Sequence, residues 1–257
     1  MLRQFALSGA FAVMFAGLAH AATVSGNFSG TIDAPSGATS TLVATGQGTN
    51  SLAWGTPTHT ATQVQAGNSS SLTVNNSAFS TNAATTGVTK ILFGTITWNN
   101  QSNWKTGGSW TSNVNFNIDF SAPSNPVSLG QSVGFSIVNT TDISGNTTTN
   151  ETTGLNPDKI SSLLLSSTAF GVPVSLGQGL VLTSVFFGLE NAGTAGTQTA
   201  VSSYDAATGQ WINREGGTST IGIYGNVSAV PLPAGVWLML GGLGGLAALR
   251  RRSRKAA

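Results

Sequence analysis

Residues 112–120 alternate strictly between apolar and polar side chains. The apolar positions are occupied by Val114, Phe116, Ile118 and Phe120. The positions between them carry amides and one carboxylate: Asn113, Asn115, Asn117 and Asp119. A period of two places each set on its own face of a β-strand, whereas a helix repeats every 3.6 residues. This segment therefore predicts a strand with one buried face and one face in water.

Other segments have the same strand character: residues 91–98, 133–137, 180–189 and 220–227. Segment 180–189 is apolar on both faces, so we expect it at the centre of a sheet. Loops are predicted around Pro123 and Pro126, and at 145–154 and 191–199, where turn-forming residues gather. Because no long amphipathic helix and no strand–helix alternation appear, we expect an all-β fold of two packed antiparallel sheets, a jelly-roll-like β-sandwich. Trp54 and Trp211 are expected in its core.

The amino-terminal residues have the order of a secretory signal peptide. Arg3 precedes an apolar stretch over residues 5–18, which we expect to form the signal helix, and Ala19-His20-Ala21 has the small-x-small form that signal peptidase accepts. We expect cleavage between Ala21 and Ala22. The predicted organisation is therefore a signal peptide over 1–21, a β-sandwich ectodomain over 22–228 and a carboxyl-terminal signal over 229–257.

The carboxyl-terminal segment has the features of a membrane stop. An apolar run over 232–249 predicts a transmembrane helix, although its five glycines suit a transient anchor better than a permanent one. A basic tail over 250–257 follows, with the charges on Arg250, Arg251, Arg252, Arg254 and Lys255. Such a cluster stays in the cytoplasm by the positive-inside rule, which places the ectodomain across the membrane.

The charge of the part between these two ends bounds its partners. Residues 22–230 contain four basic residues and all eight acidic residues of the chain, so the net charge of +2 arises from the ends. A negative ectodomain has no basic patch with which to displace counterions from phosphates, so we expect no nucleic-acid partner. The absence of cysteine excludes disulfides and thiolate metal sites.

The five residues ahead of the apolar run, Val230-Pro231-Leu232-Pro233-Ala234, resemble a known sorting signal. With the apolar helix and the basic cap, they are similar to the VPLPA-type relatives of PEP-CTERM tails of Gram-negative bacteria. That resemblance implies recognition by an exosortase-type enzyme, a cut near the motif, and transfer of the ectodomain to the cell surface or extracellular matrix. The alternative is that the prolines only mark where an ordinary anchor helix begins.

The ectodomain resembles the choice-of-anchor K domain. The resemblance lies in segments 52–57, 68–74, 92–100, 136–140 and 186–190. Members of that family carry one of several surface-sorting tails and share no established enzymatic activity. The resemblance therefore implies surface display after export through the inner membrane and transient anchoring, and it leaves the biochemistry open.

Catalytic groups are sparse. Once His20 is removed with the signal peptide, only His59 could serve a Ser-His-Asp arrangement, and no nucleophile motif accompanies it. A glycan hydrolase would need a pair of carboxylates, for which Asp119 and Glu190 at strand ends are the first candidates. We expect a non-enzymatic protein without a cofactor, with a secreted hydrolase as the remaining catalytic alternative.

Two segments are candidates for binding. Asp142, Ser144 and Asn146 place oxygen atoms at alternate positions, as a calcium loop would, but depart from the EF-hand template. Three indoles and an amide, Trp98, Asn100, Trp104 and Trp110, could form a face that holds exopolysaccharide, because sugars bind apolar rings flanked by amides. The alternative for these tryptophans is packing in the core.

Overall fold

A computed structural model describes residues 22–39, 41–55, 69–84, 86–101, 108–123, 126–139, 157–193, 202–214 and 216–230, together with residue 242. Within residues 22–230, as far as they are described, every regular element is a β-strand. The strands are β1 (Thr23–Ile32), β2 (Ala44–Thr45), β3 (Ser51–Trp54), β4 (Ser70–Asn75), β5 (Ser77–Asn82), β6 (Val88–Asn99), β7 (Ser109–Ala122), β8 (Val127–Val138), β9 (Asp158–Ser161), β10 (Val174–Gly177), β11 (Leu180–Asn191), β12 (Ser202–Asp205), β13 (Gln210–Asn213) and β14 (Thr218–Ala229).

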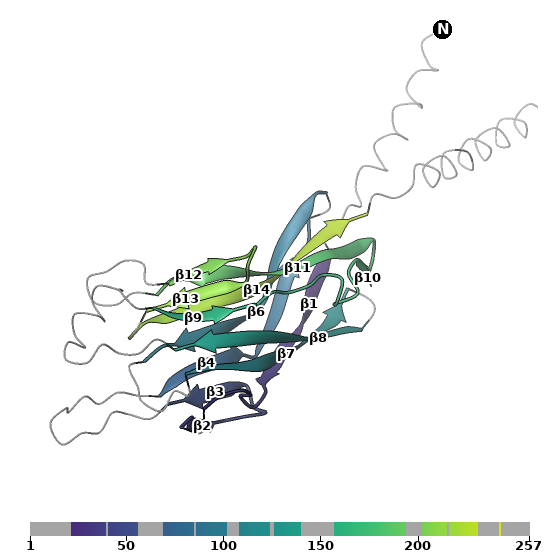
Figure 1. Cartoon of the computed structure of the whole chain (residues 1–257). Coiled ribbons are helices and arrows are strands. Elements are labelled where there is room, and N and C mark those ends of the chain that lie inside the picture. Colours follow the sequence, from purple (N-terminus) through teal and green to yellow (C-terminus); the bar gives the residue numbers. More distant parts are fainter. Residues whose placement is uncertain are drawn as a thin grey trace, which may run out of the picture.

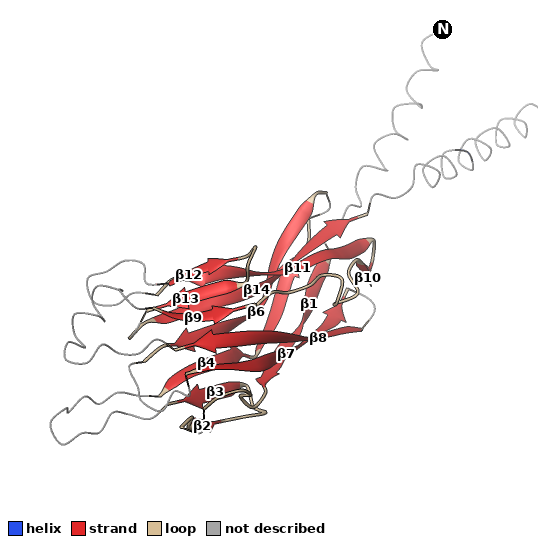
Figure 2. Cartoon of the chain, viewed as in Figure 1, coloured by secondary structure: helices blue, strands red, loops and turns tan. Residues whose placement is uncertain are grey.

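The strands form two seven-stranded sheets packed face to face (Figures 1 and 2). The first sheet has the order β12-β13-β9-β8-β7-β1-β5, and the second has the order β10-β11-β14-β6-β4-β3-β2. Every pairing between these strands is antiparallel. The expected all-β fold of two packed antiparallel sheets is therefore confirmed.

The alternation in residues 112–120 is confirmed within the longer strand β7. Val114, Phe116, Ile118 and Phe120 are buried between the sheets. The intervening amides lie on the outer face of the first sheet, where β8 and β1 flank them. A two-residue period with one buried face sets the register strongly, because a slip of one residue would turn every apolar side chain outward.

Strand β11 corrects one detail of the sequence-based expectation. Residues 180–189 do form a strand, but it lies second from the edge of its sheet, between β10 and β14, and is not central. Its inner face packs in the core through residues such as Leu182 and Phe187. Its outer apolar residue, Phe186, is instead stacked on Tyr224 of β14, with ring centroids 5.7 Å apart. The apolar residue on the outer face of β11 is therefore covered by a side chain of the neighbouring strand, and no further layer of strands or helices packs over it in the described part of the chain.

The two sheets approach each other closely around Gly94. Phe28 of β1 crosses the core, and a Cβ atom built on Gly94 of β6 would lie 2.0 Å from its ring carbon Cδ1. The pairing between β6 and β14 shifts register at this point, next to Phe93. Glycine is needed here because another sheet's aromatic ring occupies the space that any side chain would take.

The strand register brings the two ends of the ectodomain together. The amide of Ala83 donates to the carbonyl of Ala22 at 2.9 Å, and Val88, just beyond the β5–β6 turn, pairs with Ser228. The amide of Val230 donates to Gly179 at 2.7 Å at the same end of the sandwich. We call this end, defined by Ala22, Val88 and Val230, the terminal end. It lies at the upper right in Figure 1.

We call the opposite end of the sandwich the far end, and three strand pairings define it. The pairings of Trp54 with Ser70, of Ser71 with Asn99 and of Ser109 with Val138 all lie there. These strands border residues 56–68, 102–107 and 140–156, which are outside the described part of the chain. One end of the sandwich thus holds Ala22 and Val230, and the strand ends that border these longer connections lie at the other.

Candidate functional site

The residues expected to be processed are only partly within the described chain. Ala22 and Val230 are described and lie at the terminal end. Ala19, Ala21, the motif residues 231–234 and the basic residues after 249 lie outside the described residues, and the expected helix over 232–249 is described only at Gly242. Among the described residues, no helix is long and apolar enough to cross a membrane.

The expectation of an exposed aromatic sugar-binding face is wrong for the residues that the structure describes. Trp98 and Asn100 have no exposed surface and Trp110 is 2% exposed, so none can stack against or bind a sugar. Trp104 lies outside the described residues. The physical reason is the strand period: Ile96, Trp98 and Asn100 share one face of the chain, and that face points into the core.

Both described indoles of the expected sugar face instead join the two sheets. Trp110 of β7 meets Trp54 of β3 edge to face, with ring centroids 5.4 Å apart and planes at 80°. Trp98 of β6 meets Trp211 of β13 in the same manner, at 5.4 Å and 78°. Trp54 and Trp211 are therefore core residues, as expected. Edge-to-face indole pairs add to the burial energy of the rings themselves.

Asn100 serves the same inter-sheet contact through buried hydrogen bonds. Its Nδ2 donates to the carbonyl of Asn213 at 3.1 Å, and the Nδ2 of Asn213 donates to the carbonyls of Trp98 and Gly217 at 3.1 and 3.0 Å. Both amides are fully buried. The buried Oδ1 atom of Asn213 has no hydrogen-bond partner in the described part of the chain, but the donated bonds join the ends of β6 and β13 and make this cluster part of the architecture of the far end.

The calcium candidate, Asp142, Ser144 and Asn146, lies outside the described residues, as does His59. Within the described chain, no group of three His, Cys, Asp or Glu side chains could hold a metal ion. The hydrolase pair is not formed: Asp119 lies on β7 of the first sheet and Glu190 on β11 of the second. The Oδ2 atom of Asp119 accepts a hydrogen bond from Asn117 at 2.6 Å. Asp119 lies near the terminal end of β7 and Glu190 near the far end of β11, so the two carboxylates are too far apart to flank one glycosidic bond.

The outer face of the first sheet presents a continuous polar surface. Amides project along β7, and small residues lie directly opposite them on β8: Gly134 opposite Asn113, Ser132 opposite Asn115, and Gly130 opposite Asn117. Asp33 holds the amides of Asn113 and Asn115 in place, because its two carboxylate oxygens accept hydrogen bonds from them at 3.0 and 2.8 Å. The amides are therefore oriented before any ligand arrives.

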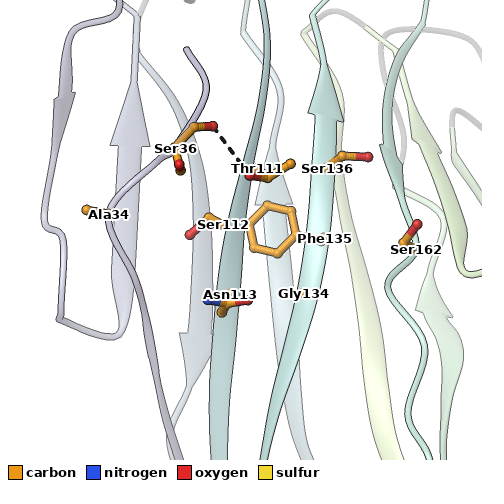
Figure 3. A pocket seen from close by; sticks show the side chains of 9 residues that line it. All are labelled: Ala34, Ser36, Thr111, Ser112, Asn113, Gly134, Phe135, Ser136 and Ser162. Carbon is orange, nitrogen blue, oxygen red and sulfur yellow. Dashed lines mark hydrogen bonds between the residues drawn. The ribbon is translucent and has the colours of Figure 1, made fainter.

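A hollow of about 380 Å³ opens on this face towards the far end (Figure 3). Gly134 contributes no side chain to it, and hydroxyl-bearing residues stand around it: Ser36, Thr111, Ser112, Ser136 and Ser162. One wall is the segment after β1, which Ser36 joins to Thr111 of β7 by two backbone hydrogen bonds of 2.8 and 2.9 Å. Ser162, on the other side, has a positive φ of 65°.

Sequence reasoning placed Asn113 on a wet face but did not assemble this hollow. Ser36 and Ser162 come from connections on either side of the β7–β8 pair, and no motif links them to it. Neutral hydroxyl and amide groups can exchange hydrogen bonds with a hydroxyl-rich ligand but offer no nucleophile–base pair. Comparison with protein-family models returns no match for this chain. Comparison with curated proteins returns no similar sequence either.

The electrostatic features of the described chain lie elsewhere. Burial, with the nearby charge of Asp205, raises the pKa of Tyr204, whose hydroxyl donates to the carbonyl of Leu163 at 2.8 Å. Hydrogen bonds from the Thr208 hydroxyl and the Ala207 amide lower the pKa of the Asp205 carboxyl. Asp205 holds the β12–β13 turn, and Tyr204 ties β12 to the segment after β9.

Proposed function

We propose that this is an exported, non-enzymatic surface or extracellular-matrix protein that is processed through its carboxyl-terminal signal. The jelly-roll-like ectodomain is released from its signal peptide after Ala21 and held for a time by the segment over 232–249. An exosortase-type enzyme then cuts near Val230-Pro231-Leu232-Pro233-Ala234, as the resemblance to VPLPA-type tails of Gram-negative bacteria implies. The likeness to choice-of-anchor K domains supports the same role.

The observation that carries this proposal is the meeting of both chain ends at the terminal end of the sandwich. The carbonyl of Ala22 accepts a hydrogen bond from the amide of Ala83, in the β5–β6 turn. Val230 follows β14, which pairs with β6 just after that turn. A membrane attachment beginning after Val230 would therefore hold one end of the domain and leave the far end pointing away. The hollow of the first sheet lies towards that free end.

The deciding experiment is the intact mass of the protein from its native host, measured separately for membrane and extracellular fractions. Loss of residues 1–21 and a cut between 230 and 234 are expected, with a mass increment where an acceptor is attached. A double variant, Pro231→Ala and Pro233→Ala, should stop the cut, and Pro126→Ala in the β7–β8 turn is the matched proline control. A membrane-bound mass that ends at Ala257 would overturn the sorting proposal.

A second candidate function is retention on exopolysaccharide through the hollow of the first sheet, in place of the buried tryptophans. It is favoured by the oriented amide of Asn113 and the hydroxyls of Ser36, Ser136 and Ser162 around an otherwise apolar hollow, because sugars are recognised through hydrogen-bonding groups beside apolar surface. Ser136→Tyr should fill the hollow and abolish retention in polysaccharide affinity gels. Thr183→Tyr, at an exposed position of the second sheet, is the control. Equal retention of both variants would sink this candidate.

A further inference from the structure

The outer face of the second sheet, over β4, β6, β14 and β11, changes character along its length. Towards the far end it is a net of hydrogen-bonded hydroxyls and amides: Asn75 donates to Thr95 and Thr97 at 2.9 Å each, and Thr97 lies 3.1 Å from the Thr220 hydroxyl. Towards the terminal end the same face carries apolar and aromatic side chains and one ammonium group. We call this second part the Lys90 patch; it consists of Val88, Lys90, Leu92, Phe186 and Tyr224.

The Lys90 patch is a built arrangement. The Tyr224 ring lies over Gly222 and Gly188, where added Cβ atoms would come within 2.7 and 3.1 Å of its Cε2 atom. Phe186 stacks beside it at an interplanar angle of 23°. The ammonium of Lys90 stands 3.6 Å from the centroid of the Tyr224 ring, which is a cation–π contact. The ring is thereby held flat on the sheet beneath a positive charge.

Exposed apolar surface surrounds this arrangement and continues to the end of the ectodomain. Val88 is 62% exposed, Leu92 is 38% exposed and Val230 is 52% exposed. Val88 pairs with Ser228, two residues before Val230. Exposed apolar side chains that gather on one part of a surface mark an interaction site more than the same side chains scattered singly do.

The sequence after Val230 indicates what this surface meets. The expected membrane segment begins at Leu232, so only Pro231 intervenes. An extended residue spans about 3.3 Å, which puts Val230 within roughly 7 Å of the level where the apolar run enters the lipid. Val88 is level with Ser228, which lies roughly 13 Å from that level.

The exposed side chains of the patch are also those of a membrane interface, because the Lys90 ammonium suits the head groups and the aliphatic Val88 and Leu92 suit the acyl-chain boundary. Tyr224 is only 8% exposed and supports Lys90 from beneath.

We propose that the Lys90 patch rests on the phospholipid surface while the protein is anchored, with the Lys90 ammonium paired to lipid phosphate. This inference rests on the proposed function, since the tail must be embedded for the patch to arrive there. It adds an orientation: the domain tilts so that the outer face of the second sheet meets the bilayer near the terminal end, while the far end and the hollow of the first sheet stay in water. The contact orients the domain before the tail is cut.

The test uses the full chain in nanodiscs of phosphatidylcholine and phosphatidylglycerol. Because the chain has no cysteine, Val88→Cys carries a single environment-sensitive fluorophore. We expect a blue shift at residue 88 and loss of emission when spin-labelled lipids are included. Thr218→Cys, an exposed position at the far end of β14, is the matched control and should show neither. Unchanged urea midpoints for both variants establish that the fold is intact.

Charge reversal gives the second readout. Lys90→Glu should lose the lipid quenching at residue 88, whereas Lys90→Arg should keep it, because arginine retains both the charge and the cation–π contact. Flotation of the full chain with liposomes tests the tail separately, and failure to float would overturn the proposed anchoring. Flotation with residue 88 still in water would overturn only the present inference. A blue shift without lipid quenching would do the same, since another protein surface would then cover the patch.

Discussion

Trp98 of β6 and Trp211 of β13 meet edge to face across the two sheets, and only one of the two indole nitrogens has a hydrogen-bond partner. The Nε1 atom of Trp211 donates to the hydroxyls of Ser202 and Ser219 at 3.0 and 3.1 Å. The buried Nε1 atom of Trp98 has no hydrogen-bond partner in the described part of the chain. The two rings therefore share one packing contact, but only Trp98 buries an N–H group without a hydrogen bond.

This difference predicts an unequal response to phenylalanine. Trp211→Phe leaves the buried Ser219 hydroxyl and the half-buried Ser202 hydroxyl without their donor, whereas Trp98→Phe removes a nitrogen that was unsatisfied. We expect Trp211→Phe to lower the free energy of unfolding by about 1 kcal/mol more than Trp98→Phe. Urea denaturation followed by circular dichroism measures both. Equal losses would contradict the hydrogen-bond argument, and Val88→Ala at an exposed position should change the value little.

The close approach at Gly94 predicts a large effect from one methyl group. Gly94→Ala would force the Phe28 ring out of its place, and overpacking of this kind costs about 1–3 kcal/mol. Gly134→Ala is the matched control, because its Cβ would meet only the Asn113 side chain at 3.4 Å on the outer face. We expect a lower thermal midpoint for Gly94→Ala alone. A control variant that is destabilised as much would show that strand glycines, and not the Phe28 contact, decide the effect.

At the buried position of Asn213, we expect a carboxylate to be far less stable than the amide, although the two groups have nearly the same shape. Its Nδ2 donates to two carbonyls, so Asn213→Asp would place a carboxylate against the oxygens of Trp98 and Gly217. An unpaired charge that is buried in place of a hydrogen-bonded amide lowers the free energy of unfolding by at least about 3 kcal/mol. Asn191→Asp should be nearly neutral, because the Oδ1 atom of Asn191 accepts from the Gly193 amide, as a carboxylate also can. Chemical denaturation of both variants is the measurement.

Tyr204 predicts a loss of stability in alkali. Burial, assisted by the charge of Asp205, raises its pKa above the ordinary value of 10.0. The unfolded chain then releases the phenolic proton at a lower pH than the folded chain, so the stability that the neutral phenol contributes is full below pH 10 and falls above it. Tyr204→Phe should weaken this dependence. Urea midpoints at pH 9 and 11 test it, and an equal fall in both proteins would assign the effect to other groups.

Much of the fold follows from local pattern. The alternation in 112–120 places β7 correctly, with its buried and wet faces, because side chains in a strand alternate whatever the partner strand is. The same reasoning could have placed Trp98, which has the parity of the buried Ile96. The sugar-face hypothesis failed because three tryptophans close in sequence were grouped together, whereas the fold sends Trp98 and Trp110 to different sheets and pairs each with a distant indole.

The sequence alone determined the strand character of the clearly alternating or apolar segments, such as 112–120, and the buried face of β7, because these depend on residue type and a period of two. It also excluded a disulfide framework, because the chain has no cysteine. Cross-strand register was decided only by the tertiary structure, because it depends on which strands pair and how far they slide. Register brings Ala22 beside the turn that precedes Val88, seats Tyr224 over two glycines beneath Lys90, and opens the hollow between Ser36 and Ser162. These surfaces exist because residues far apart in sequence meet in space, and burial of the paired sheets holds them there.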